Sequence, residues 1–391
     1  MRSPIGCKCF AHIKCRWFRA VFFCDFQVVS AYCWRQGLSL NSVSELLRDD
    51  LDNCLARTRD LWSELRDQRI FITGATGFFG YWLLETLLHA NRELHLNTRV
   101  TILTRNAANL QQKSPQLACD PALEILTGDI RTFAFPSGEF SRVIHGATES
   151  SAELNAKHPT LMFDTIVEGT RHCLEFAKAA EAKKFLFLSS GAVYGTQSPE
   201  VHHVAEDSTC GPNPLDAASA YAEGKRAAEL LCTLESRNSN LEVKIARCFA
   251  FVGPGMKLDT HFAIGNFIRD QIHGDPIRVT GDGSALRSYM YAGDLMVWLW
   301  TILFRGTPLR AYNVGSEQAV SIRELAHSVS EALLPKVGVE ILGIPGPGPA
   351  QRYVPSTARA RQELGLSCEV PLRDAIRRTQ SWILATSPPV K

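Results

Sequence analysis

The sequence has almost no excess of charge of either sign. Its 391 residues carry 42 Lys and Arg against 40 Asp and Glu, a formal net charge of +2, and no run rich in Lys or Arg occurs. Surfaces that bind nucleic acid are strongly basic, so we expect no nucleic-acid partner. Long hydrophobic runs are also missing. The very apolar stretch Met296–Phe304 is far shorter than the about 20 residues of a membrane span. We interpret it as a buried core helix and expect no membrane contact.

Metal-binding cysteine patterns are missing as well. Five of the twelve cysteines lie within residues 1–40, but no second Cys-x-x-Cys and no paired histidine completes a zinc motif. We therefore expect no metal site. The other seven cysteines are scattered and form no disulfide framework, which favours a reducing, cytoplasmic location.

The first forty residues differ in composition from the rest. They carry six Lys or Arg against the single acid Asp25, and Arg19 and Asp25 interrupt the apolar stretch Phe18–Trp34. This stretch makes a poor membrane span or signal segment. We predict that residues 1–40 are a poorly ordered extension, which a start codon assigned too far upstream would explain; a basic targeting segment is the alternative.

Ordinary folded sequence begins after residue 40. Apolar residues recur at helical spacing from Leu47 to Leu65, so an amphipathic helix is predicted within residues 41–68. This helix would cover a sheet edge or build a subunit contact. Apolar residues make up 45% of the chain, enough for a sizeable core.

A glycine-rich turn follows the first predicted strand. The apolar run Arg69–Thr73 reads as a buried strand, and a helical pattern starts at Tyr81. Between them Gly74 permits a tight turn, Gly77 allows a diphosphate to approach the backbone, and Gly80 allows the helix to pack against the strand. The helix N-terminus offers free N–H groups to phosphates. Because strand and helix flank the glycines, a dinucleotide site is favoured over a ligand-free turn.

Three further strand ends point to the same nucleotide. Arg105 follows the strand Arg99–Thr104, where an acid would bind the ribose of NAD; an arginine better suits the 2′-phosphate of NADP, although it could also stack on adenine. Asp129 and Ile130 follow the strand Leu123–Leu126, where Asp129 could meet the adenine amino group or simply make a turn. Ala147 ends the strand that starts at Arg142, among small residues that allow close approach.

A hydroxyl, a phenol and an ammonium follow further along the chain. The buried strand from Lys184 brings Ser190 to its carboxyl end, where ligands bind in open parallel sheets. Tyr221 and Lys225 are one turn apart on a predicted helix. The pair alone would suit a surface helix, but the glycine motif makes chemistry on a bound nicotinamide the better interpretation.

With these motifs in order, the chain resembles the NAD-dependent epimerase/dehydratase family, extended short-chain dehydrogenases that act on nucleotide sugars. The resemblance runs from Arg69 to about Leu384. Besides the glycine, Gly128–Ile130, Ser189–Gly195 and Tyr221/Lys225 motifs, it is carried by Ala246–Phe249, Val252–Gly255, Gly281–Gly283, Arg287–Tyr291 with Asp294, and Tyr312–Gly315. It implies an α/β fold: a Rossmann-type doubly wound parallel sheet over residues 69–250, with a smaller mixed α/β lobe at residues 251–391, interleaved with it.

The resemblance also implies the roles of the site residues. Tyr221 would be the acid/base, Lys225 its electrostatic and ribose-binding partner, and Ser190 the residue that orients the substrate. A free tyrosine has a pKa of about 10, and lowering it by about 3 requires roughly 4 kcal/mol, which Lys225 and the positive nicotinamide ring can supply. The implied cofactor-binding residues are Gly74, Thr76, Gly77, Phe78, Phe79, Gly80, Arg105, Asp129, Ile130, Ala147, Tyr221 and Lys225.

The substrate implied is a nucleotide-diphosphate sugar, and a homodimer is expected. Arg287 and Arg352 could clamp the diphosphate, since guanidinium matches phosphate geometry, or could be solvated surface residues. Asn266 joins them as a substrate-binding candidate.

Two departures from the family narrow the expected reaction. Dehydratases of the family carry an Asp-Glu pair where this chain has Gly191 and Ala192, and decarboxylases carry a glutamate at the second position. Neither residue here can move a proton. An epimerase or keto-sugar reductase, NAD- or NADP-dependent, is therefore expected, with a dehydratase or decarboxylase as the alternative; Glu206 or Asp207 could replace the missing acids. Ala250 replaces an asparagine that contacts the diphosphate in many relatives. A non-catalytic dinucleotide sensor is a further alternative, which the intact Ser190, Tyr221 and Lys225 disfavour.

Overall fold

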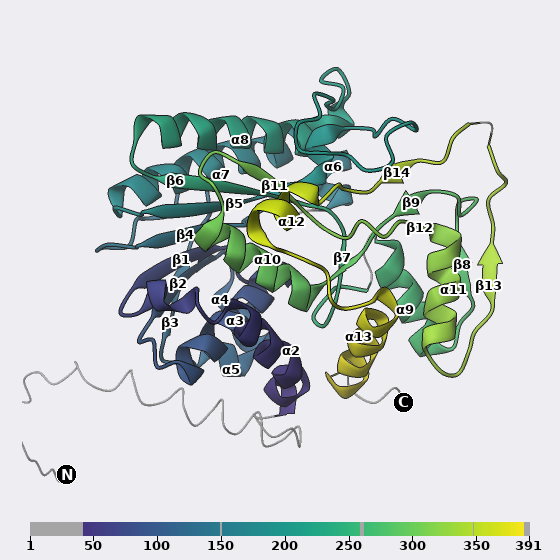
Figure 1. The fold of residues 1–391 in the computed structure, drawn as a ribbon, viewed down its shortest axis with the longest axis horizontal. Coiled ribbons are helices and arrows are strands. Elements are labelled where there is room, and N and C mark those ends of the chain that lie inside the picture. The colour runs from purple at the N-terminus through teal and green to yellow at the C-terminus, as the bar shows by residue number, and fades with distance from the viewer. Residues whose placement is uncertain (1–41, 149–150, 259–261, 347, 387–391) are drawn as a thin grey trace, which may run out of the picture. The chain divides into compact units, whose positions relative to one another are not determined.

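Seven parallel strands form the central sheet of the molecule (Figure 1). The computed structural model describes residues 42–148, 151–258, 262–346 and 348–386. The strand order is β11-β6-β5-β4-β1-β2-β3. Strands β2 and β3 are added on one side of β1, and the chain then crosses back to add β4, β5, β6 and β11 on the other side. This confirms the predicted doubly wound α/β fold. The strands are β1 (Arg69–Thr73), β2 (Arg99–Thr104), β3 (Leu123–Thr127), β4 (Arg142–His145), β5 (Lys184–Ser190), β6 (Glu242–Cys248) and β11 (Ala311–Val314).

Helices cover both faces of this sheet, and β1 shows why. Phe71 joins the core under helices α7 (Pro159–Ala179) and α8 (Ala220–Asn238), whereas Ile70 and Ile72 join the core that contains helices α3 and α10. Successive side chains of a strand point to opposite faces, so a strand buried on both faces is apolar throughout. The other helices around the central sheet are α3 (Phe78–Glu93), α4 (Ala107–Lys113), α5 (Pro115–Ala118), α6 (Ala152–Lys157), α10 (Ala292–Arg305) and α12 (Ala358–Leu364), with 3-10 turns η2 (Gly191–Tyr194) and η3 (Ala217–Ser219).

A smaller lobe follows β6, on the right of Figure 1. Its strands form small separate sheets, in the orders β12-β9-β14, β13-β8 and β10-β7. The two parts are interleaved, because β11 and α10 come from this half of the chain and yet pair with β6 or pack against the central sheet. The lobe contains β7 (Phe251–Val252), α9 (Ala263–His273), β8 (Ile277–Val279), β9 (Leu286–Arg287), β10 (Met290–Tyr291), β12 (Val320–Ser321), α11 (Ile322–Ala332), β13 (Val339–Ile341), β14 (Arg352–Tyr353) and α13 (Leu372–Thr386).

The helix predicted within residues 41–68 is shorter than expected. Helix α2 spans Ser42–Thr58, and a separate 3-10 turn, η1, spans Trp62–Leu65. The Thr58 hydroxyl donates to the Cys54 carbonyl and accepts from Nε1 of Trp62, whose ring lies 4.8 Å from that of Trp300 on α10. Trp62, in the turn that follows the helix, is buried against Trp300, a residue distant in sequence.

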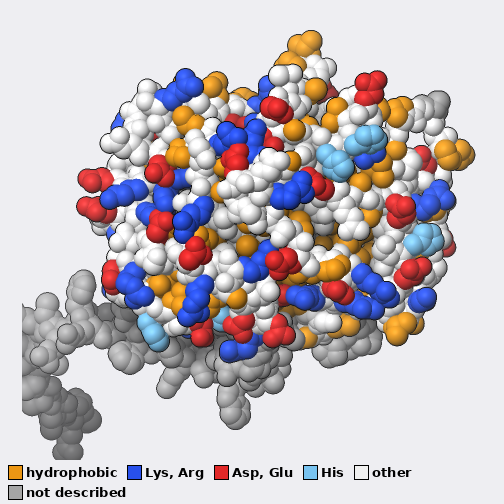
Figure 2. Space-filling model, viewed as in Figure 1, with side chains coloured by type: hydrophobic (Ala, Val, Ile, Leu, Met, Phe, Trp, Pro, Cys, Tyr) orange, Lys and Arg blue, Asp and Glu red, His pale blue; other side chains and the backbone are white. Residues whose placement is uncertain are grey.

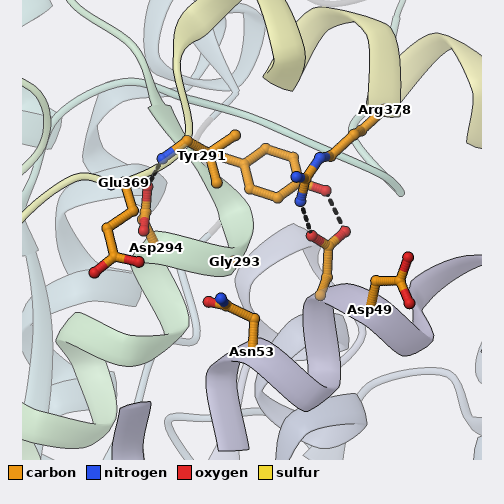
Figure 3. A pocket seen from close by; sticks show the side chains of 9 residues that line it. Asp49, Asn53, Tyr291, Gly293, Asp294, Glu369 and Arg378 are labelled. Atoms are coloured by element: carbon orange, nitrogen blue, oxygen red, sulfur yellow. Dashed lines mark hydrogen bonds and ion pairs between the residues drawn. The ribbon is translucent and has the colours of Figure 1, made fainter. Parts of the chain in front are cut away.

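Helix α2 is joined to the smaller lobe by buried polar contacts rather than lying alone on a sheet edge. Asp50 accepts hydrogen bonds from Tyr291 and Arg378, and Arg57 lies 2.6 Å from Asp294 on α10. Figure 3 shows Tyr291, Asp294 and Arg378 around a cavity between α2, α10 and α13, whose volume is about 340 Å³. The buried carboxylates of Asp50 and Asp294 both have partners within the protein. Their presence at the cavity is therefore explained by the contacts that join α2 to the rest of the chain.

Residues 1–41 lie outside the described residues, and so do the expectations made for them. On the face displayed in Figure 2, acidic and basic side chains are interspersed. None of the helices in the described part of the chain has the length and apolar character of a membrane span.

Candidate active site

The glycine motif forms a tight turn between β1 and α3. Gly74 has a φ of +76°, which favours glycine, and a Cβ there would lie 2.5 Å from the carbonyl oxygen of Gly146. A Cβ on Gly80 would lie 2.2 Å from Cα of Ala75. The turn at Gly74 and the packing of α3 against β1 at Gly80 agree with the sequence analysis, and Gly74 also allows the end of β4 to approach closely.

The N-terminus of α3 has the features of a diphosphate site. Its N-cap residue is Gly77, which has no side chain to cap the helix, and no acid occupies the first turn. The first N–H groups of the helix lack internal partners and carry the positive end of the helix dipole. This uncapped, closely approachable turn fits the diphosphate of a nicotinamide dinucleotide.

Thr73 joins the two strand ends beside this turn. Its hydroxyl oxygen accepts hydrogen bonds from the backbone N–H of Gly146 and Ala147, at 3.2 and 3.1 Å, and lies 2.8 Å from Nδ1 of His145. Burial and the nearby Lys225 lower the pKa of His145 to about 3, so this imidazole is neutral. Because Thr73 ends β1 and binds Ala147 just after β4, Ala147 lies at the switch point of the sheet, where dinucleotides bind in such folds.

The expected adenine end of the site contains an ion pair within one loop. Arg131 donates to both carboxylate oxygens of Asp129, at 2.9 and 3.0 Å, and these bonds hold the pKa of Asp129 below its usual value. Arg105 also lowers that pKa by its charge. Ile130 is buried, close to the backbone of Gly169 on α7. Asp129 therefore has a turn-forming role in this structure, and its contact with adenine stays a prediction.

The structure brings Ser190 and Tyr221 together at the carboxyl edge of the sheet. Ser190 ends β5, and its hydroxyl oxygen accepts from the N–H of Ala192 at 3.1 Å. Tyr221 lies in the first turn of α8. Burial raises the pKa of Tyr221, and a hydrogen bond with Ser190 acts in the opposite direction.

Lys225 lies beside them but contacts different groups. Its ammonium donates to the carbonyl of Leu188 at 2.8 Å and to the hydroxyl of Thr148 at 3.1 Å, and lies 6.0 Å from the centre of the Tyr221 ring. Burial lowers its own pKa to about 8. The lowering of the Tyr221 pKa expected from Lys225 together with a nicotinamide ring stays a prediction, and burial alone acts against it.

A buried ionic network holds the end of β5 in place. Arg247 donates to both carboxylate oxygens of Glu229, and the Ser189 hydroxyl donates to the same carboxylate at 2.6 Å. Arg247 also donates to the Tyr194 hydroxyl, which donates to Asn313. Sequence reasoning missed Glu229. The only feature of the sequence that could have indicated Glu229 was its position, one helical turn after Lys225.

Glu206 was considered as a replacement for the acids missing at positions 191 and 192. Its carboxylate accepts from the backbone N–H of Asn313 at 2.9 Å and lies 3.9 Å from Arg359, and its side chain is 4% exposed. It therefore anchors the loop to β11, and reaching Ser190 would require breaking both contacts.

The register of one small sheet separates the two arginines that were predicted to bind substrate. Arg287 and Arg352 lie on paired strands, but the register sets Arg352 opposite Leu286 and Arg287 opposite Tyr353. Since paired residues share a face, the two arginines point to opposite faces of this small sheet. Arg352 extends toward the carbonyl of His202, 3.5 Å away. Asn266 lies on α9, where its amide oxygen accepts from Arg269.

Comparison with known proteins agrees with this geometry. The model of the NAD dependent epimerase/dehydratase family matches residues 70–315. The chain belongs to this family. UDP-glucuronic acid decarboxylase 1 of Arabidopsis thaliana is 30% identical over 313 residues, 80% of this chain and 69% of that protein. UDP-glucuronic acid decarboxylase 6 of the same plant is 29% identical over 79% of this chain and 87% of its own.

Solved structures share the fold. A UDP-glucuronic acid 4-epimerase variant from Bacillus cereus, solved with NAD and a fluorinated UDP-sugar, superimposes with a TM-score of 0.69 at 21% identity. The match covers 82% of this chain and all of that one. Members of the epimerase/dehydratase family are enzymes.

Proposed function

We propose that this protein transfers a hydride between a nicotinamide dinucleotide and one carbon of a nucleotide sugar. The observation that carries the proposal is the meeting of Ser190, Tyr221 and Lys225 at the sheet edge that also holds the glycine turn of Gly74. The glycine turn at Gly74 and the start of α3 would hold the dinucleotide, whose nicotinamide would supply the hydride acceptor and donor. Tyr221 takes up or releases the proton of the sugar hydroxyl, and Ser190 holds the oxygen of that hydroxyl and of the ketone that replaces it.

The chain's own residues account for cofactor binding. The uncapped start of α3 holds the diphosphate, and the main chain at Gly146 and Ala147 allows close approach beside it. Lys225 is positioned by Leu188 and Thr148 near the site of the ribose. Turnover on a panel of nucleotide sugars, together with fluorescence titration of the reduced cofactor, tests the proposal. Cofactor binding with no turnover on any sugar would favour a sensor.

We propose NADP as the preferred cofactor, because the residue that directly follows β2 in the sequence is Arg105 and not an acid. Arg105→Ala is expected to weaken NADP binding by about tenfold or more, the loss typical of a charge-assisted hydrogen bond, and to change NAD binding little. Titration of both reduced dinucleotides against both proteins measures this. Equal losses for the two would show that Arg105 stacks on adenine or faces solvent.

The reaction is proposed to be epimerisation or reduction of a keto sugar. Gly191 and Ala192 supply no acid or base for eliminating water, and Glu206 is held at β11. Incubation with nucleotide hexoses in deuterated water, followed by mass spectrometry, is expected to give no dehydrated product. Loss of water with deuterium at C6 would contradict this and identify a dehydratase.

Decarboxylation of a nucleotide hexuronate is the second candidate, favoured by the decarboxylases at 29–30% identity. Oxidation at C4 of a hexuronate places a ketone β to the carboxylate, and such acids lose carbon dioxide readily. Against it, the family resemblance implies a glutamate in decarboxylases at the position where this chain has Ala192. Release of carbon dioxide from a nucleotide hexuronate, with the same Tyr221 requirement, would select this activity over the first.

A further inference from the structure

Tyr221 lies in the first turn of a helix that does not cap itself. The N-cap residue of α8 is Ser219, and its side chain makes no capping hydrogen bond. Tyr221 is the second residue of the helix, and N–H groups at such positions have no partner within an α-helix. Helix ends fray, so the place of the Tyr221 phenol depends on what else holds this turn.

Asn155 on α6 supplies a cap from outside the helix. Its side-chain oxygen accepts from the backbone N–H of Tyr221 at 3.0 Å, and its amide nitrogen donates to the carbonyl of Ala218 at 2.8 Å. These partners fix the orientation of the amide, because a backbone N–H can only donate and a carbonyl can only accept. Asn155 therefore makes the bond that the side chain of an N-cap residue usually makes.

The chain that leads into Tyr221 gives this turn little other support. Residues 213–218 are all exposed. The Asp216 carboxylate accepts from the N–H of Ala218, but that bond lies within the segment itself. Segments with few buried contacts open locally at a small cost in free energy. Asn155 ties this exposed segment to α6 at the point where it enters α8.

The second turn of α8 is held without Asn155. Gly224 packs so closely on α7 that a Cβ there would lie 3.1 Å from Cδ1 of Ile166. Lys225 is anchored by its two hydrogen bonds to groups outside the helix. Loss of Asn155 would therefore loosen Tyr221 and leave Lys225 in place.

We propose that Asn155 is a positioning residue, which holds Tyr221 and its phenol in place for proton transfer. The proposal rests on the proposed role of Tyr221 as acid/base. Asn155 moves no proton and acts through the main chain of Tyr221, 66 positions further along the chain. A displacement of about 1 Å at a reacting group can cost about 10²-fold in rate, so the effect falls on kcat.

Asn155→Ala in the full-length protein tests the proposal, because alanine suits α6 and removes only the amide. We expect kcat to fall about tenfold, the size of loss typical of one helix cap, with KM for the sugar and dinucleotide affinity little changed. Hydrogen exchange of the amides at the start of α8 should become about tenfold faster, and exchange in the rest of α8 should not change.

Asn91→Ala is the matched control. Asn91 lies on α3 and makes the same two kinds of bond, to the N–H and the carbonyl of Thr98, at 2.9 and 3.0 Å. Its loss should leave kcat and the exchange of α8 unchanged. Asn155→Asp keeps the oxygen that accepts from Tyr221 and places a favourable negative charge at the helix N-terminus. Slow exchange and most of kcat should return in this variant.

The exchange measurement needs no substrate, so it separates this proposal from the proposed function. Unchanged exchange in Asn155→Ala would overturn the cap. Faster exchange at the start of α8 with a wild-type kcat would overturn the positioning role, and so would faster exchange throughout the protein, which indicates a general loss of stability. An active Tyr221→Phe enzyme would instead overturn the proposed function, while the exchange of Asn155→Ala still decides whether Asn155 caps α8.

Discussion

Tyr221→Phe is expected to abolish turnover while leaving dinucleotide binding nearly intact. The substitution removes only the hydroxyl that lies beside Ser190, and the α8 helix and the Lys225 contacts remain. Positioned proton transfer contributes about 10²–10⁴-fold to a rate, so a loss of that size is expected. Turnover measured with the preferred nucleotide sugar, alongside fluorescence titration of the reduced cofactor, checks both halves of the expectation.

Tyr312→Phe is the matched control for the Tyr221→Phe experiment. It removes a phenol hydroxyl that bonds Glu363 and the N–H of Thr307, away from Ser190, and should retain most of the activity. Retention of more than about a tenth of the rate by Tyr221→Phe would contradict the acid/base assignment.

Gly80→Ala is expected to damage both the fold and the cofactor site. The new methyl group would lie 2.2 Å from Cα of Ala75 and 2.4 Å from the carbonyl oxygen of Gly74, both backbone atoms. Overpacking of this kind costs about 1–3 kcal/mol or more, because α3 must move away from β1. The N–H groups at the start of α3 move with it. We expect a lower midpoint of chemical unfolding and dinucleotide binding weakened by about tenfold or more, which corresponds to about 1.4 kcal/mol.

Gly281→Ala is the matched control for Gly80→Ala. Gly281 follows β8 in the smaller lobe, and a Cβ there would meet nothing within 4 Å. Its unfolding midpoint and dinucleotide affinity should match the unsubstituted protein. If Gly80→Ala also matched it, the close approach of α3 to β1 would not be required for the site.

Much of the nucleotide-binding half was predictable, because its signals are local. A buried parallel strand is a short apolar run, and the turn after it needs glycine wherever the backbone is left-handed or closely approached, as at Gly74 and Gly80. The strands Arg69–Thr73 and Arg99–Thr104 were predicted with the bounds that the structure shows. The spacing of Tyr221 and Lys225 on one helix face was visible for the same reason.

Other features depended on contacts between distant segments. Sequence alone could not show that Trp62, just beyond the end of the first helix, packs against Trp300, because the two residues are distant in sequence. It could not separate Arg287 from Arg352, because the register of β9 and β14 decides which face each occupies.

The family, the glycine turn and the candidate residues Ser190, Tyr221 and Lys225 could therefore be recognised from the sequence, since each of their motifs lies within a few consecutive residues. Only the tertiary structure decided what holds the start of α8. Asn155 lies 66 positions before Tyr221, and it reaches the N–H of Tyr221 because α6 packs beside the turn that leads into α8. A cap made by the N-cap residue is visible in the sequence, but a cap from a distant helix follows from the packing of the whole chain, and no local pattern specifies it.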